Sequence, residues 1–214
     1  MGSDMLARDG RRDDVRAMGE GLVGMALQVR DAFIRLDGAP LDEAARIGRR
    51  IHRQEQALIR EIVEAAAGPP LRADEEVIFV PMHVERIADN LELLGAGVAR
   101  MIRLGIPFTD RANREMRCLL DAVVELLEGL RDALRTGNRT LLRYVQDAGR
   151  SCVAQANEYA LFHEQRLIEG VCQPEASSIY LAMIDHLKGV EWHARQVAAK
   201  LTPEAPSTSA PLPR

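Results

Sequence analysis

Three acidic residues lie close together in the stretch HVERIADNLELLGAG, which begins at His83: Glu85, Asp89 and Glu92. Glu85 and Asp89 are four positions apart, so on a helix their side chains lie one above the other on the same face. Two carboxylates there repel each other unless a cation or a basic side chain lies between them. Hard cations such as Mg²⁺, Ca²⁺ or Mn²⁺ prefer carboxylate oxygens. The spacing therefore allows two interpretations: a metal site, or a solvated helix edge that Arg86 neutralises.

Apolar residues at helical spacing predict an all-α protein, and the breaks DGAP, GPP, LGIPFTD and TGN divide the chain into six helical segments. Pro81 falls inside the third segment, where it is expected to kink the helix or delay its start. The first residues, 1–12, and the Pro/Ser-rich tail, 202–214, are expected to be disordered. The expected helices cover about residues 13–37, 41–67, 74–104, 110–136, 139–170 and 174–201.

The two halves of the chain resemble each other. A shift of 103 positions carries His83 onto His186, and it carries Glu55 and Glu61 onto Glu158 and Glu164. Matches at core positions are expected of any two amphipathic helices, but matched polar residues at a kept spacing are harder to obtain by chance. We therefore predict an internal repeat of two tandem three-helix bundles, residues 13–104 and 110–201. Short connections make consecutive helices antiparallel neighbours.

The motif VERIADNLELLGAG resembles the LERIGDHAxNIAE-like motif in the last helix of each repeat of PhoU proteins. PhoU proteins are similar in layout as well, with two tandem three-helix bundles, and the resemblance covers residues 14–201. It implies a cytoplasmic, non-enzymatic adaptor that regulates phosphate uptake or phosphate-starvation signalling in bacteria. The implied partners are a phosphate ABC transporter and a sensor histidine kinase, and homodimerisation is expected.

The resemblance also implies a metal site. The family carries an acidic pattern, E/D-x-x-x-D, that binds metal clusters on the bundle surface, and Glu85 and Asp89 match it. Glu55 matches an acidic position of the family's middle helix, and His52, one turn earlier, could reach the same site. Glu92 is a further candidate ligand. The expected metal is iron or another hard cation, with Mn, Mg, Ca, Zn and Ni as alternatives.

The second half departs from this pattern, because Lys188 stands at the position of the expected Glu and Trp192 at that of the expected Asp. A lysine is cationic, and an indole N–H cannot ligate a metal. The second family-type site is therefore expected to be lost. Weaker candidates for a different site in this half are Glu158, Glu164, His163 and His186.

Other protein classes find little support in the sequence. The net charge is −4 and no basic block occurs, so nucleic-acid binding has no electrostatic basis. No apolar run approaches the roughly 20 residues that a membrane span needs. Cys118, Cys152 and Cys172 lack metal-type spacing and are expected to be reduced thiols of a cytoplasmic protein. Glu-x-x-His, His-Glu-x-x-His, P-loop and Gly-x-Ser-x-Gly motifs do not occur.

Two alternatives to the adaptor stay open. One is a metal-dependent enzyme or a metal-storage bundle. The other is a metal-free interaction scaffold of PhoU descent, in which Glu85 and Asp89 are ordinary surface residues.

Overall fold

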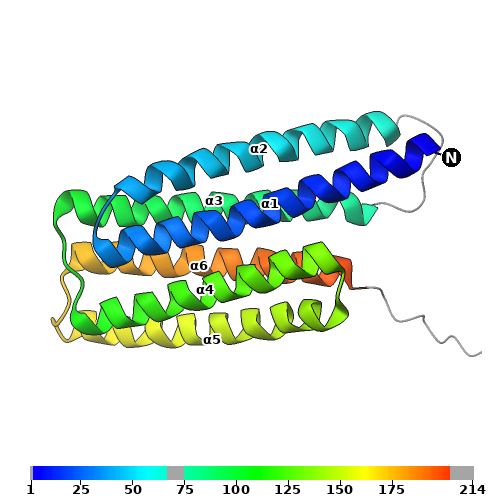
Figure 1. Cartoon of the computed structure of the whole chain (residues 1–214). Helices are drawn as coiled ribbons and strands as arrows, with labels where there is room; N and C mark the ends of the chain where they lie inside the picture. Colours follow the sequence, from blue (N-terminus) through cyan, green and yellow to red (C-terminus); the bar gives the residue numbers. More distant parts are fainter. Residues whose placement is uncertain (1, 67–74, 203–214) are drawn as a thin grey trace, which may run out of the picture.

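The structure, a computed structural model, describes residues 2–66 and 75–202, and within them the chain forms six α-helices and no strand (Figure 1). The all-α fold class is confirmed. Asp74, where the third helix was expected to start, and the tail from residue 203 lie outside the described residues. The helices are α1 (Gly2–Arg35), α2 (Ala39–Ala66), α3 (Glu75–Leu104), α4 (Asp110–Thr136), α5 (Arg139–Ile168) and α6 (Pro174–Leu201).

Local capping explains several helix ends. The Thr109 side chain accepts a hydrogen bond from the Ala112 N–H at 3.2 Å and so caps the start of α4. Gly137 ends α4 with φ 64°, a left-handed conformation that favours glycine. Asn138 then caps α5 by accepting from the Thr140 N–H at 2.8 Å. A proline, Pro174, opens α6, where its missing N–H costs nothing.

The first helix starts earlier than expected, whereas the third starts close to its expected position. The first helix begins at Gly2 rather than near residue 13, so residues 2–12 are helical rather than disordered. In the third helix, Pro81 lies inside α3, which begins at Glu75, so the proline does not delay the helix start. No helix within the described ranges is long and apolar enough to cross a membrane.

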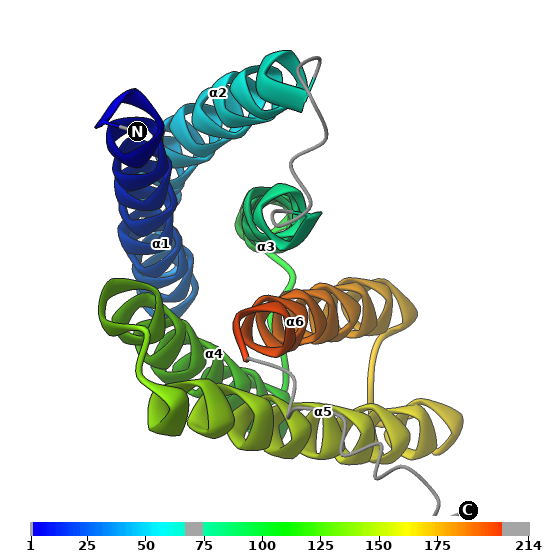
Figure 2. The ribbon, with the colours of Figure 1, turned by 90° about the vertical axis from the view of Figure 1, so that its right-hand side faces the viewer.

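The six helices form layers in which α2 and α5 lie on the outside and α1, α3, α4 and α6 lie between them (Figures 1 and 2). In the centre, α1 packs against α4 and α3 packs against α6. Each pair joins helices at equivalent positions of the two halves. The two three-helix units therefore meet through the helices that the repeat relates to each other.

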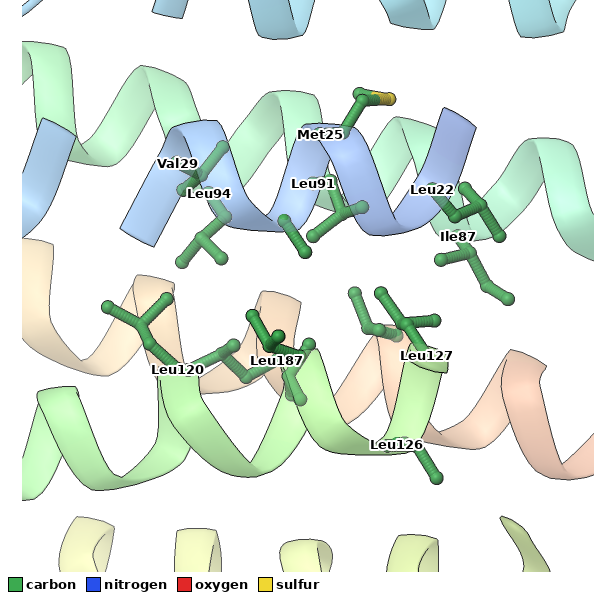
Figure 3. Close-up of a cluster of buried hydrophobic side chains, with 14 of the residues drawn as sticks. Leu22, Met25, Val29, Ile87, Leu91, Leu94, Leu120, Leu126, Leu127 and Leu187 are labelled. Atoms are coloured by element: carbon green, nitrogen blue, oxygen red, sulfur yellow. The ribbon is translucent and has the colours of Figure 1, made fainter. Parts of the chain in front are cut away.

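One continuous hydrophobic core fills the space between these central helices. Figure 3 shows Leu22 and Leu91, from α1 and α3, facing Leu127 and Leu187, from α4 and α6. All four are at most 1% exposed, and burying a leucine side chain contributes roughly 1.5–3 kcal/mol. The contact between α3 and α6 is close at Gly189, where a Cβ would overlap the Asn90 side chain. The two units thus share one core, although the division into residues 13–104 and 110–201 as separate domains stays a prediction.

Candidate metal centre on helices α2 and α3

The acidic residues singled out by the sequence lie on the face that α3 shares with the outer helix α2. His52 of α2 contacts Glu85 of α3, with 3.1 Å between Nδ1 and Oε1. The Gln56 amide donates to Nε2 of the same ring at 2.9 Å. Because Nε2 accepts, Nδ1 carries the proton in neutral His52 and donates it to Glu85. The imidazole is therefore held in one tautomer and one orientation beside the Glu85 carboxylate.

Arg86 supplies the positive charge between Glu85 and Asp89. Its Nη1 donates to Asp89 Oδ2 at 2.9 Å, and its Nε lies 3.8 Å from Glu85 Oε2. The Glu85 side chain is 13% exposed, whereas those of Asp89 and Arg86 are 41% and 58% exposed. The repulsion expected between these two carboxylates is thus relieved by a neighbouring guanidinium on the same helix.

Glu55 and Glu92 enlarge the acidic surface. Burial raises the pKa of Glu55, and the nearby charge of Glu85 raises it further. Burial likewise raises the pKa of Glu92, with Asp89 adding to the effect. Burial is the main cause of both shifts, and the neighbouring carboxylates add to it. A cation bound here would lower both pKa values.

A glycine makes room for this arrangement. A Cβ at Gly48 of α2 would overlap the Glu92 carboxylate, so only a residue without a side chain lets that carboxylate lie against α2. A signal for this role is present in the sequence, because Gly48 lies in the middle of a strongly amphipathic helix, where glycine is unfavourable. The predicted site nevertheless omitted Gly48.

The donor chemistry fits a hard cation, but the arrangement of the side chains fits it only in part. Of the five residues predicted as ligands, the structure brings His52 and Glu85 into contact and joins Glu85 to Asp89 through Arg86. Nowhere among the residues that the structure describes do three His, Cys, Asp or Glu side chains gather closely enough to hold a metal ion. For cation binding, Arg86 would have to leave the two carboxylates. The metal site therefore stays a prediction.

In the second half, the weaker candidates lie in different surroundings. Glu158 and Glu164 are exposed on α5, whereas His163 is 2% exposed. The His163 ring stacks on Tyr180 at 4.2 Å between ring centroids. His186 is half-buried on α6, and burial lowers its pKa.

Lys188 and Trp192, which stand at the acidic positions of the family motif, make other contacts. Lys188 lies 3.5 Å from Asp185 on its own helix. Trp192 is 46% exposed and packs edge-on against His193. The His193 ring in turn contacts His83 across the α3–α6 contact, with 3.0 Å between their Nδ1 atoms. This pair of imidazoles joins the two halves.

Sequence reasoning missed a buried ion pair that joins the three helices of the second unit. The Glu115 carboxylate of α4 accepts from both Nη atoms of Arg166 on α5, at 3.1 and 2.7 Å. It also accepts from the Tyr180 hydroxyl of α6 at 2.8 Å and from Arg111 Nε at 2.9 Å. Glu115 could have been noticed, because it stands beside Met116 in the apolar stripe of its helix.

The fold, rather than the sequence, connects this chain to known proteins. No protein-family model and no curated protein sequence matches the chain. A crystal structure of PhoU from Pseudomonas aeruginosa is similar with a TM-score of 0.82, at 17% sequence identity. The similarity covers 92% of this chain and 95% of that one. The fold is PhoU-like.

A second structure agrees with this assignment. The phosphate transport system regulatory protein PhoU from Streptococcus pneumoniae is similar with a TM-score of 0.69 at 12% identity. Here the similarity covers 92% of this chain and 94% of the other. The expected PhoU-like layout of two three-helix units is confirmed. Because the identities are this low, the PhoU-like fold is what the likeness establishes.

Proposed function

We propose that this protein is a non-enzymatic regulator of phosphate transport in the cytoplasm. The observation that carries the proposal is the match over nearly the whole length of both chains to PhoU from Pseudomonas aeruginosa. The second match supports it, since that protein is a phosphate transport system regulatory protein. A match confined to one three-helix unit would support only a common building block.

The regulator would act by binding other proteins. The long outer helices α2 and α5 leave extended faces for docking, and the motif resemblance points to a phosphate ABC transporter and a sensor histidine kinase as partners. Homodimerisation belongs to the same proposal. The direct test is to purify the tagged full-length chain from its host and to identify what accompanies it. Co-purification of the transporter or the kinase supports the adaptor, and the absence of both under high and low phosphate would count against it.

A metal ion on the α2–α3 face is the second part of the proposal. Glu85 and Asp89 would provide the main ligands, with Glu55, His52 and Glu92 around them. Supporting this are the carboxylates that surround the face: Glu85 adds to the raised pKa of Glu55 and Asp89 to that of Glu92, although burial is the larger cause of both shifts. A bound cation would neutralise this surface and hold α2 against α3.

Elemental analysis of the purified protein tests the metal. The Glu85→Ala/Asp89→Ala variant should lose bound metal and keep its helical content. A matched control is Asp121→Ala/Glu125→Ala, which removes two exposed carboxylates at the same spacing from α4. Equal metal content in the two variants would show that Glu85 and Asp89 do not bind the metal.

The same experiments separate the alternatives. A metal-free scaffold would co-purify with its partners, yet the wild-type protein would contain no stoichiometric metal. A metal-dependent enzyme or storage bundle would contain metal and would show activity toward O₂ or phosphoesters, or metal uptake beyond a fixed stoichiometry. Loss of metal together with loss of partner binding in the double variant supports the metal-binding adaptor.

A further inference from the structure

A cavity of about 510 Å³ opens at the end of the bundle where α1 begins and α6 ends, the end that Figure 2 faces. Residues from all six helices line it. Its volume lies within the range of small-molecule sites in proteins, roughly 300–1,000 Å³. None of the five residues of the candidate metal centre lines the cavity.

The charged side chains that line the cavity are all basic. Four arginines take part, Arg11, Arg12 and Arg16 of α1 and Arg135 of α4, and among the residues that the structure describes no Asp or Glu lines the cavity. In a chain whose net charge is −4, such a lining favours an anion. Arginine is suited to this role, because its planar guanidinium binds carboxylate or phosphate oxygens in pairs.

These arginines are not fully used by the protein itself. Arg16 pairs with Asp13 at 2.7 Å and Arg135 with Glu20 at 3.4 Å, but the side chains of these two pairs are 43–71% exposed. Exposed ion pairs of this kind contribute little, about 0–1 kcal/mol, and can be exchanged for another anion. The Nε of Arg16 is buried and has no acceptor among the described residues. A buried donor normally has a partner, so Arg16 has hydrogen-bonding capacity that the described residues do not use.

The remaining wall is aliphatic. Leu58, Val80, Leu134, Leu142 and Leu201 line it, each from a different helix. Within residues 2–66 and 75–202 the lining includes no Phe, Tyr or Trp, so a nucleobase would lack the aromatic ring on which bases usually stack. A flexible hydrocarbon chain needs only apolar surface to be buried. The arginines and the aliphatic wall together therefore fit a ligand with an anionic head and an alkyl chain.

We propose that this cavity binds a small amphiphilic anion, a free molecule with a linear alkyl chain and a carboxylate or phosphate head. The head lies between Arg16 and Arg135, and the chain packs against Leu58 and Leu142. Such a ligand contacts α1 of the first unit and α4 of the second at once. Its binding therefore stabilises the joined arrangement of the two units by linkage. This inference stands independently of the proposed regulatory function.

Titration calorimetry of the full chain with three probes tests the proposal. Sodium decanoate below its micelle concentration carries both features, decanol carries only the chain, and inorganic phosphate carries only the charge. We expect one decanoate per chain, with decanol and phosphate at least tenfold weaker. Equal binding of decanol and decanoate would show that the arginines play no part, and equal binding of phosphate would show the same for the apolar wall. Either result overturns the proposal.

Variants locate the site. Arg16→Gln/Arg135→Gln should weaken decanoate at least tenfold while leaving decanol unchanged. The matched control, Arg50→Gln/Arg103→Gln, removes two exposed arginines outside the lining and should bind decanoate as the wild type does. Val15→Trp, which adds bulk to the wall, should abolish binding with all four arginines present. Circular dichroism confirms that each variant is folded. Unchanged decanoate affinity in both Arg16→Gln/Arg135→Gln and Val15→Trp would place the ligand elsewhere and refute the assignment.

Discussion

Replacing Glu115 by alanine should destabilise the protein far more than replacing an exposed carboxylate of the same helix. The Glu115 carboxylate accepts four hydrogen bonds, two from Arg166 and one each from Tyr180 and Arg111. Burial opposes its ionisation, but the hydrogen bonds outweigh that effect and lower the pKa of Glu115. The substitution leaves the Arg166 guanidinium, 10% exposed, without its counter-charge.

The expected loss follows from these contacts. Breaking a buried pair by removing one partner costs about 3–5 kcal/mol, because the other charge stays buried and unpaired. For a protein of this size, 1 kcal/mol corresponds to about 2–4 °C in melting temperature. Glu115→Ala should therefore melt on the order of 10 °C below the wild type. Replacing both partners, as in Glu115→Leu/Arg166→Met, should recover most of the loss, since no charge then remains buried.

Thermal and urea denaturation followed by circular dichroism measure this effect. Glu125→Ala is the control on the same helix, because Glu125 is exposed, and it should stay within about 0.5 kcal/mol of the wild type. Equal stability of Glu115→Ala and Glu125→Ala would refute the reasoning. So would a double variant less stable than Glu115→Ala alone, because the unpaired guanidinium would then not be the cause.

Three further predictions concern titration, packing and reactivity. Burial and the neighbouring His83 lower the pKa of His193 from 6.5 to about 4. Between about pH 6.5 and pH 4, His193 is therefore protonated in the unfolded chain but neutral in the folded one. Stability is lost as the pH falls through this range. Allowing for partial exposure, the free energy of unfolding falls by about 1–2 kcal/mol over this range. Urea denaturation at pH 7 and pH 5 should show that this free energy falls less in His193→Phe than in the wild type. Gly48→Ala should change the free energy of unfolding by no more than about 1 kcal/mol, since better helix propensity offsets the displacement of a flexible side chain. The displaced Glu92 carboxyl should titrate closer to its ordinary pKa by NMR, and an unchanged value would contradict the packing against α2. Burial raises the pKa of Cys152 to about 12, so iodoacetamide should alkylate exposed Cys118 and spare Cys152 in the native protein at pH 8; equal labelling by mass spectrometry would argue against that burial.

Much of the fold could be predicted because long amphipathic helices repeat their apolar residues with a fixed period. The segment from Pro174 to Leu201 shows this, since its expected and observed bounds coincide. Residues 2–12 show the limit of the method. They carry no apolar stripe of their own, yet they form the first turns of α1.

The candidate site was harder to predict than the helices that carry it. Spacing along α3 placed Glu85 and Asp89 on one face, but it could not show that Arg86 turns toward both of them. The partner of a long side chain is decided by how neighbouring helices are rotated and by which rotamers remain open. The Glu115 network was missed for the same reason, because two of its partners, Arg166 and Tyr180, come from helices far away in the sequence.

The central proposal is that this PhoU-like chain regulates phosphate transport, and deleting its gene in the host organism tests that proposal most directly. Phosphate uptake should be measured in phosphate-replete and phosphate-poor medium, in the deletion strain and in the same strain complemented with the wild-type gene. We predict that uptake in the deletion strain no longer responds to phosphate supply and that complementation restores the response. Normal regulation of uptake in the deletion strain would contradict the account.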